Sequence, residues 1–387
     1  MVSSLTCLRR LSHAARGRLR THFQAGLITL GASLLLGCGQ APTPVQIGLL
    51  VDATGANSQQ GIASRNGAQL AIEQANASGG INGQPIELLF KDDASSLAAA
   101  QQALDELIKG KVEAALGPSN SMLALQLAPQ ASQAGLLLIS STAISPLLAG
   151  QDDQFFRTLS HKNLDAQRLA QHLHQDLGLV RVSAIVEESN SAYTEAWLSD
   201  FNRYLQAAGG TAAAALRFSR DGDTDYVALT QQLLAEQPQA VVLICNGSDA
   251  ALLATQLRQR QPDLILAAAS WATASLPELG GHAVEGLITA QVFDLQDTSQ
   301  AFMALQNAYV QRFKAPLNTI AILNYNASNV LVQALRQRQA DESLKQALLR
   351  IRSFQGVQQL ISFDGFGDVD SPARLKIIHA GQFIDAQ

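Results

Sequence analysis

Short apolar runs alternate with amphipathic stretches along the chain from Val45 onward. The runs are rich in Val, Ile, Leu and Ala, and they look buried on both faces, as the strands of parallel sheets are. The stretches between them carry apolar residues at helical spacing. A repeated strand–helix alternation is typical of βαβ units. The pattern therefore predicts an α/β protein.

The first series of elements lies before residue 140. A break at Gly79–Gly80 ends its first helix. We expect strands over Val45–Val51, Ile86–Phe90, Ala114–Leu116 and Leu136–Ile139, with helices over Ala63–Ala75, Ala98–Ile108 and Leu123–Ala134.

A second series begins after Phe155–Arg157. We expect strands over Val182–Val186, Ala214–Phe218, Ala240–Ile244 and Leu264–Ala268, with helices over Asp165–Leu177, Tyr193–Ala208, Tyr226–Ala235 and Ala250–Arg260. The two series predict two doubly wound parallel sheets, each buried on both faces by helices. The order of the strands is left open by periodicity.

The first forty residues have the layout of a secretory signal. A cationic leader with five arginines precedes an apolar stretch, Ala25–Leu36, that is short for a membrane span. The stretch ends in Leu35-Leu36-Gly37-Cys38, which resembles the lipobox of bacterial lipoproteins and implies lipidation of Cys38. We expect residues 1–37 to be a lipoprotein signal peptide and residues 38–44 a tether. The alternative is a short apolar helix with a chance cysteine.

Composition excludes some classes of function. The chain has 387 residues, 47% hydrophobic and 15% charged, so it has enough apolar side chains for two domains. A formal net charge of −5 and dispersed basic residues after the leader argue against nucleic-acid binding. The three cysteines, Cys7, Cys38 and Cys245, fit neither a zinc site nor a redox pair. We read Cys245 as a buried hydrophobe.

The sequence offers no pattern typical of an enzyme. The seven histidines lack the spacing of a metal site or catalytic triad, and we find no nucleophile elbow and no standard phosphate-binding glycine loop. Asp92 and Asp93 form an adjacent acid pair, which we interpret as turn or capping residues rather than a general acid and base. We therefore expect no catalysis, no cofactor and no metal.

A set of turn and helix-end motifs in the first hundred residues resembles the pattern of one family. It comprises Thr54-Gly55, Gly61, Asn66-Gly67-Ala68, Ala75-Asn76, Gly79-Gly80-Ile81-Asn82-Gly83 and Lys91-Asp92-Asp93. This pattern is similar to that of the leucine/isoleucine/valine-binding family of ABC-transporter substrate-binding proteins, which have the type I periplasmic-binding fold. The resemblance extends over nearly all of residues 45–370.

The resemblance implies two lobes joined by a three-crossover hinge, with a ligand cleft between them. Lobe one would hold residues 45–158 with 292–355, and lobe two residues 160–290 with 357–387. The crossings would lie near Leu159, Gln291 and Gly356. The partners that it implies are a small-molecule solute, an ABC-transporter permease and, through the lipid, a membrane.

Polar loops after two strands of the first series are candidate ligand contacts. Ser119 and Ser121 follow one strand, and Ser141 and Thr142 follow the next. Ligands of doubly wound sheets bind beyond the carboxyl ends of strands, although Ser and Thr in such loops also cap helices. The resemblance favours Ser121 and Thr142 as ligand contacts.

Four further candidates would lie elsewhere around the cleft. Tyr193 matches a family tyrosine that faces the cleft, and Gln60 stands where several relatives have one. Asp249 and Trp271 follow two strands of the second series, so they would close the cleft from the other side. Trp271 would either stack on the ligand or sit in the hinge.

Departures from the family pattern leave the ligand open. Ile144 stands where amino-acid binders usually carry a threonine, and the uncharged Ala269 stands where the branched-chain receptors carry an acid. Asp249 is the remaining acid for an ammonium group. Burying an unpaired ammonium in a dry cleft would be costly. We therefore expect a small polar ligand, which is an amino acid, an amide or an organic acid. The alternative function is a regulatory envelope lipoprotein that uses the same fold to bind a protein.

Overall fold

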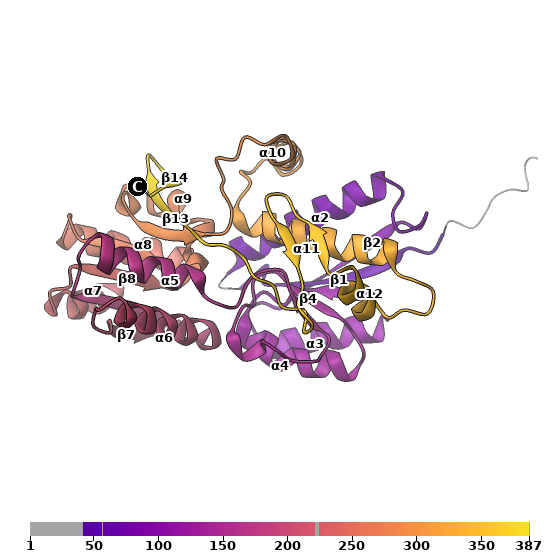
Figure 1. Ribbon diagram of the computed structural model, residues 1–387, viewed down its shortest axis with the longest axis horizontal. Helices are drawn as coiled ribbons and strands as arrows, with labels where there is room; N and C mark the ends of the chain where they lie inside the picture. Colours follow the sequence, from indigo (N-terminus) through magenta and orange to yellow (C-terminus); the bar gives the residue numbers. More distant parts are fainter. Residues whose placement is uncertain (1–41, 56, 221–223, 387) are drawn as a thin grey trace, which may run out of the picture. The chain divides into compact units, whose positions relative to one another are not determined.

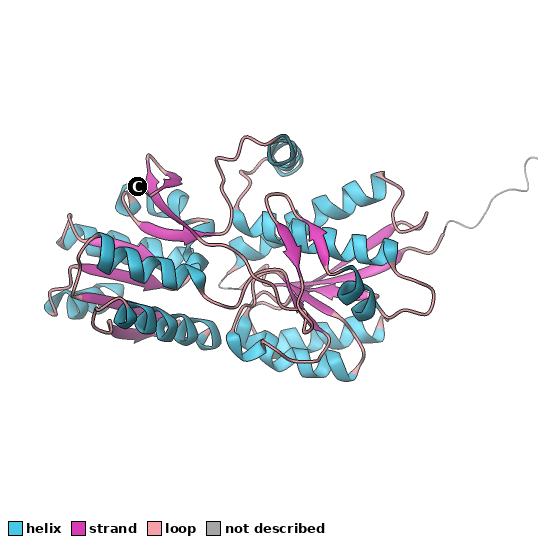
Figure 2. Cartoon of the chain, viewed as in Figure 1, coloured by secondary structure: helices cyan, strands magenta, loops and turns pink. Residues whose placement is uncertain are grey.

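The computed structural model describes residues 42–55, 57–220 and 224–386. The expected signal peptide and Cys38 lie outside these residues. From Pro44 onward the chain builds two large sheets, each with helices on both faces, and one small two-stranded sheet (Figures 1 and 2). We call the unit around the first sheet lobe one and the unit around the second sheet lobe two.

Lobe one is a five-stranded parallel sheet of order β2-β1-β3-β4-β5. Its strands are β1 (Val45–Val51), β2 (Ile86–Asp92), β3 (Ala114–Leu116), β4 (Leu138–Ser140) and β5 (Phe155–Arg157). Its helices are α2 (Ser58–Ala77), α3 (Leu97–Lys109), α4 (Ser121–Gln133), the short η1 (Pro146–Leu148) and, from later in the chain, α10 (Gln300–Phe313), α11 (Thr319–Gln337) and α12 (Leu344–Ile351).

Side-chain alternation along β1 explains how the lobe-one sheet is covered. Ile47, Leu49 and Val51 point to the face covered by α2, α11 and α12. Leu50 points to the opposite face, which α3 and α4 cover (Figure 1). A central parallel strand must be apolar at successive positions because both of its faces are buried. The apolar run at Val45–Val51 is this central strand.

Helices α2 and α11 are in close backbone contact although they are far apart in the sequence. A Cβ atom placed on Gly67 of α2 would lie 2.1 Å from the carbonyl oxygen of Ala321 in α11. Only glycine permits that approach. The contact holds α11, which comes from the second half of the sequence, firmly on lobe one.

Lobe two is a seven-stranded sheet of order β14-β13-β10-β9-β8-β6-β7. Its strands are β6 (Val182–Glu187), β7 (Ala214–Phe218), β8 (Ala240–Ile244), β9 (Ile265–Ala268), β10 (Ile288–Gln291), β13 (Arg374–His379) and β14 (Gln382–Asp385). Its helices are α5 (Leu164–Gln171), η2 (His172–Asp176), α6 (Ser191–Ala207), α7 (Tyr226–Ala235), α8 (Gly247–Arg260), η3 (Ser270–Ala274), α9 (Leu276–Gly280) and η4 (Gly281–Val284).

Lobe two repeats the two-sided burial of lobe one. Val242 and Ile244 of β8 face α5 and α6, whereas Val241 and Leu243 face the side that α8 covers. Cys245 follows on that second side and is fully buried, as expected for a small hydrophobe. Strands β6 to β10 are parallel, but β13 and β14 are antiparallel additions at one edge. The expected parallel sheet is therefore present, with an antiparallel pair added at one edge.

The chain passes between the lobes three times, and the third passage lies later than expected. The sequence placed it near Gly356, with residues 357–387 in lobe two. Instead, β11 (Ser353–Gln355) pairs with β12 (Leu360–Ser362) in a hairpin. Phe354, Phe363 and Val369 belong to the lobe-one core. The hairpin turns the chain back, so it leaves lobe one only after Val369.

A buried ion pair connects two segments of the chain at the points where they leave lobe one. Arg157, at the end of β5, is fully buried, and its Nε donates to Asp368 Oδ1 over 2.8 Å. Its Nη2 donates to the same oxygen, and its Nη1 donates to the Ser145 carbonyl oxygen over 2.8 Å. Burial lowers the pKa of Arg157, and the neighbouring Asp368 opposes that shift. The guanidinium is thus satisfied on three nitrogens.

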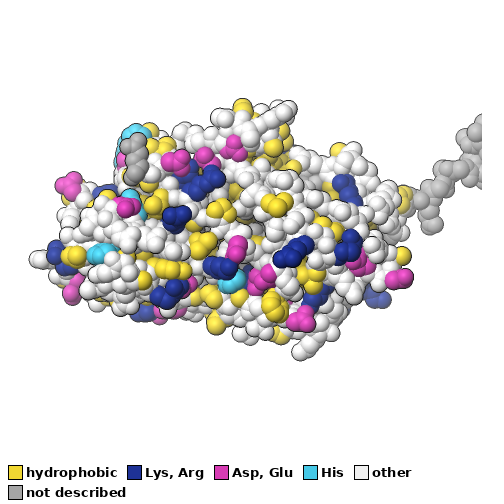
Figure 3. All heavy atoms as spheres, in the orientation of Figure 1, with side chains coloured by type: hydrophobic (Ala, Val, Ile, Leu, Met, Phe, Trp, Pro, Cys, Tyr) yellow, Lys and Arg dark blue, Asp and Glu magenta, His cyan; other side chains and the backbone are white. Residues whose placement is uncertain are grey.

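The surface carries charges of both signs. On the face seen in Figure 3, basic and acidic side chains are interspersed. Within the described ranges, no helix combines the length and the apolar character needed to cross a bilayer.

The Arg157–Asp368 pair yields a stability prediction. Asp368→Asn leaves a buried guanidinium without its counter-charge, so we expect a loss of about 3–5 kcal/mol in the free energy of unfolding. Urea titration followed by circular dichroism measures it. Glu195→Gln is the matched control, because the Glu195–Arg217 pair is about 40% exposed on both sides and such pairs contribute about 0–1 kcal/mol. Equal losses in the two variants would contradict the prediction.

Candidate functional site

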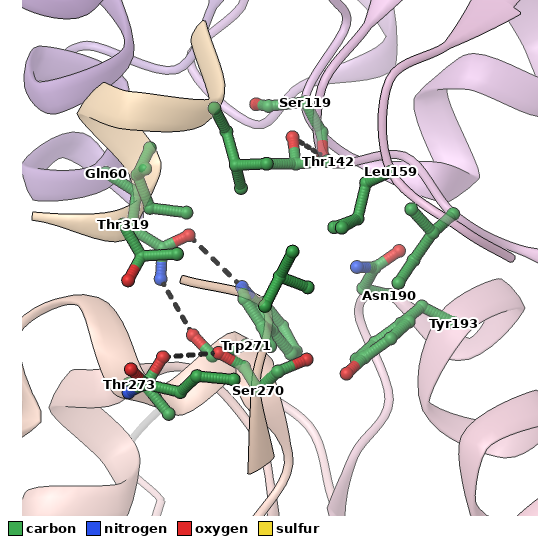
Figure 4. A pocket seen from close by; sticks show the side chains of 15 residues that line it. Gln60, Ser119, Thr142, Leu159, Asn190, Tyr193, Ser270, Trp271, Thr273 and Thr319 are labelled. Carbon is green, nitrogen blue, oxygen red and sulfur yellow. Dashed lines mark hydrogen bonds between the residues drawn. The ribbon is translucent and has the colours of Figure 1, made fainter. Parts of the chain in front are cut away.

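A cavity lies where the carboxyl ends of the strands of both lobes meet (Figure 4). It encloses about 650 Å³ of empty space, counting the part that is open to solvent. Its lining residues come from both lobes and from the crossings between them: Gln60, Ser119, Thr142, Ile144, Leu159, Asn190, Tyr193, Ser270, Trp271, Thr273, Gln291, Val292, Thr319, Ile320 and Leu323.

The lobe-one wall is built by two loops that hydrogen-bond to each other. Thr142, two residues after β4, donates its hydroxyl hydrogen to the Ser119 carbonyl oxygen over 3.0 Å. Ser140 donates to the Pro118 carbonyl oxygen over 2.7 Å. Ser121 accepts from the backbone N–H of Ser145 over 3.2 Å. These bonds fix the positions of Ser119 and Thr142 at the cavity.

The lobe-two wall is aromatic. Tyr193, in the first turn of α6, meets Trp271 edge to face, with ring centroids 5.9 Å apart. Behind them, the Asp165 carboxylate accepts from Trp197 Nε1 over 2.8 Å and from the Ser270 N–H over 3.3 Å. This carboxylate holds the turn that presents Trp271.

Gln60 and Trp271 connect the lobes across the cavity. Gln60, on α2 of lobe one, donates from Nε2 to the Trp271 carbonyl oxygen over 3.3 Å. In return, Trp271 donates from Nε1 to Gln60 Oε1 over 3.2 Å (Figure 4). A second link lies nearby, where the Met122 N–H of lobe one donates to Asn190 Oδ1 of lobe two over 3.4 Å. These bonds can form only while the two strand edges face each other closely.

One buried side chain in the lining, Gln291, has no hydrogen-bond partner among the described residues. Gln291, at the end of β10, is 2% exposed, and both its Oε1 and its Nε2 are unpaired. Tyr193 is 4% exposed, and its hydroxyl lies beside the Ser270 side chain and the Trp271 backbone. Each buried polar group left unpaired costs about 1–3 kcal/mol. A ligand that supplied the missing hydrogen bonds would recover that free energy.

The cavity is electrically neutral at physiological pH. Among the fifteen lining residues, none is Asp, Glu, Lys, Arg or His. Tyr193 is the titratable member, and burial raises its pKa well above the usual value, so it stays protonated. In this lining we find neither an acid–base pair nor a charged nucleophile.

Five of the eight ligand contacts expected from the sequence line this cavity. These are Gln60, Ser119, Thr142, Tyr193 and Trp271. Whether they touch a ligand stays a prediction.

The other three candidates lie outside the lining. Ser121 and Ser141 are buried, and Ser121 accepts the bond from Ser145 described above. Asp249 is turned into lobe two, where its carboxylate accepts from Tyr226 Oη over 2.7 Å and from Asn246 Nδ2 over 3.1 Å. Burial raises its pKa. An ammonium group in the cavity therefore has no contact with Asp249 in this arrangement.

Sequence reasoning missed Gln291, Asn190 and the first turn of α11 as parts of the wall. Gln291 was identified only as a crossing point. A polar residue that closes the apolar strand Ile288–Gln291 is a weak signal for a cavity residue, and Asn190 precedes a helix, where Asn is common as a cap. Thr319, Ile320 and Leu323 are far from the other residues in sequence, and α11 was not predicted.

The acid pair Asp92 and Asp93 lies outside the cavity lining. Asp92 accepts from the backbone N–H groups of Ala53 and Ala94 and from the Thr54 hydroxyl, as a turn acid does. Asp93 is 1% exposed, and burial raises its pKa to about 6. In the described ranges, no cluster of three His, Cys, Asp or Glu is placed to hold a metal ion.

Sequence comparison finds one family model that matches most of the chain. Residues 44–373 match a family described as periplasmic binding protein. The Leu/Ile/Val-binding protein BraC3 of Rhizobium johnstonii is 28% identical over 60% of this chain and 63% of its own length, just under two thirds. The leucine-, isoleucine-, valine-, threonine- and alanine-binding protein of Pseudomonas aeruginosa is 23% identical over 85% of this chain and 88% of its own.

Solved structures with the same fold bind chemically different ligands. The leucine-binding protein LivK of Thermotoga maritima superposes with a TM-score of 0.80 at 23% identity, over 89% of this chain and 98% of its own. A solute-binding protein of an ABC transporter from R. palustris, in complex with benzoate, also gives 0.80, at 16% identity over 88% and 95%. At these identities the likeness shows the fold alone.

The raised pKa of Asp93 predicts a pH dependence of stability. The pKa of the Asp93 carboxyl is 3.8 in the unfolded chain and about 6 in the folded protein, so the folded protein binds the carboxyl proton more tightly. Asp93 therefore lowers the free energy of unfolding as the pH rises from about 4 through about 6. Asp93→Asn removes that loss. Relative to the parent, the variant should gain on the order of 3 kcal/mol in the free energy of unfolding between pH 4 and pH 7.5. Urea titrations at both pH values measure it. Asp105→Asn is the control. The prediction would be contradicted if Asp93→Asn and the parent differed in free energy of unfolding by the same amount at both pH values.

Proposed function

Since the chain belongs to the periplasmic binding protein family, as the match over residues 44–373 shows, we propose that it is the solute receptor of an ABC importer. In this role it captures a small molecule outside the cytoplasm and presents it to the permease. The observation that carries the proposal is the cavity between the strand ends of the two lobes. Capture of a small molecule requires such a cavity, and binding of another protein does not.

Closure of the lobes is the mechanism that the geometry supports. Residues from both lobes line the cavity, so a ligand that contacts both walls stabilises the arrangement in which they face each other. The Gln60–Trp271 pair adds two hydrogen bonds to that arrangement. Opening breaks these bonds and frees the ligand. The mechanism involves no covalent step, in keeping with relatives that are named as binding proteins.

The ligand we propose is small and polar: an amino acid, an amide or an organic acid. Relatives are named for branched-chain amino acids, and a structural neighbour holds benzoate. The lining offers hydroxyl and amide groups beside apolar side chains, which suits molecules with a polar end and an apolar body.

We also propose that the receptor is tied to a membrane by lipid on Cys38. The cationic leader, the short apolar stretch and the lipobox-like ending support an exported lipoprotein, with residues 38–44 as the tether. The body would then work on the outer side of the membrane that holds its permease.

A regulatory lipoprotein that binds a protein partner is the rival function. The missing ammonium partners at Ile144 and Ala269 motivate it. A cleft filled by bulky side chains would favour it. The cavity described above instead supports the transport receptor.

Ligand binding should be detectable as stabilisation of the protein. A bound solute at 100 times its dissociation constant adds about 2.7 kcal/mol to stability, so at least one compound from a panel of amino acids, amides and organic acids should raise the melting temperature by several degrees. Thr319→Trp places an indole in the cavity and should abolish that rise. Leu252→Trp, on the half-exposed face of α8, is the control and should retain it. A complete panel without a hit would contradict the receptor proposal.

The lipid anchor gives a separate prediction. In cells that express the full chain, Cys38→Ser should move the protein from the membrane fraction to the soluble fraction and abolish its labelling by a radioactive fatty acid. Cys245→Ser, at a buried position in lobe two, should leave labelling unchanged. Labelling that persists in the Cys38→Ser protein would refute lipidation at this residue.

A further inference from the structure

The unpaired side chain of Gln291 says more about the ligand than any other group in the cavity wall. It lies where β10 passes into the second crossing, and it is 2% exposed. Neither of its polar atoms finds a partner among the described residues. A primary amide carries an acceptor oxygen and a donor nitrogen in one plane, side by side. Gln291 therefore holds an unused donor–acceptor edge in the cavity wall.

The chemical complement of that edge is another donor–acceptor edge. A carboxamide, a lactam or a urea can accept from Nε2 and donate to Oε1 at the same time. A carboxylate only accepts, so it would leave Oε1 unpaired and facing a negative oxygen. An ammonium group only donates, so it would leave Nε2 unpaired. Among these groups, only the amide type satisfies both atoms.

The rest of the wall agrees with an uncharged ligand. The lining lacks carboxylate, amine, guanidinium and imidazole groups. A charged group in such an enclosed site must give up hydration without gaining a counter-charge. The buried Tyr193 hydroxyl stays protonated, because burial raises its pKa well above the usual value, so it adds no charge to the wall.

The remainder of the ligand is apolar and small. Ile144, Leu159 and Val292 belong to the lining, as do Ile320 and Leu323 of α11. This wall suits a hydrocarbon or aromatic body rather than the ammonium of an α-amino acid.

We infer that the receptor is specific for an uncharged ligand with a carboxamide-type edge on a small apolar body, and that Gln291 is the residue that selects it. The inference rests on the proposed receptor function and narrows it. It separates this chain from relatives named for leucine, isoleucine and valine, whose ligands are zwitterions.

Two matched sets of compounds test the inference. The first shares one aliphatic skeleton: 4-methylpentanamide, 4-methylpentanoate and leucine. The second pairs benzamide with benzoate. Isothermal titration calorimetry on the purified protein at pH 7.5 gives each affinity. We expect an amide to bind at least tenfold more tightly than its carboxylate and than leucine. Equal or tighter binding of a carboxylate or of leucine would overturn the inference.

Substitution of Gln291 tests whether this residue makes the selection. Gln291→Leu should lower amide affinity at least tenfold and bring the amide-to-carboxylate ratio close to one. It should not lower the melting temperature of the ligand-free protein, because it removes a buried amide that has no partner. Gln256→Leu, on α8 outside the cavity lining, is the matched control and should keep both affinity and ratio. An unchanged ratio in Gln291→Leu would assign selection to another residue and overturn this part of the inference.

A second variant keeps the test decisive if Gln291→Leu fails to fold. Gln291→Glu has the same shape but only accepts hydrogen bonds when ionised, so amide affinity should fall and carboxylates should bind more weakly still. Carboxylate affinity equal to that of the parent would contradict a contact with Gln291. If none of the five compounds binds but another solute of the panel does, the inference fails and the receptor proposal stands. If no solute binds, both fail.

Discussion

The burial of both faces of two parallel sheets is the constraint on which the structure depends. In β1, successive residues point to opposite cores, so Ile47 and Leu49 contact one layer of helices and Leu50 the other. A shift of the strand by one residue would exchange these faces, and a parallel connection needs a helix to return the chain. Every loop that follows one of the parallel strands therefore lies at the same edge of its sheet. The cavity exists because two such edges meet.

Much of the fold follows from short-range pattern. The strands Val45–Val51, Ala114–Leu116 and Ala240–Ile244 have the bounds that their apolar runs indicate, because a strand buried on both faces leaves little ambiguity. The hairpin of β11 and β12 was missed. Its strands have three residues each. Phe363 joins the lobe-one core through a long-range contact with Phe156, and Phe354 packs against Phe363. Periodicity within a short window does not contain that contact.

The site was predictable in part for the same reason. Ser119 and Thr142 follow predicted strands, so their place near an edge can be read locally. The role of Gln291 could not be predicted in this way, because it depends on the burial of its amide and on the lack of a hydrogen-bond partner in the folded protein. Five other lining residues come from the crossings and α11: Leu159, Val292, Thr319, Ile320 and Leu323. Their place beside the lobe-one and lobe-two walls depends on how the lobes join. Asp249 was expected at the cleft because it follows a strand. In the structure it lies inside lobe two instead, where its carboxylate accepts hydrogen bonds from Tyr226 and Asn246.

The Arg157–Asp368 ion pair has a consequence for how the lobes move. Arg157 is the last residue of β5, immediately before the first crossing, and Asp368 lies just before the third. The pair fastens both departing segments to one point of lobe one, so they cannot slide past each other. Three chain segments link the lobes. The first and the third, which the ion pair holds together, therefore act as one pivot, and the second, after Gln291, is the other pivot. Two pivots define an axis, and rotation about that axis is the low-energy displacement left to the lobes.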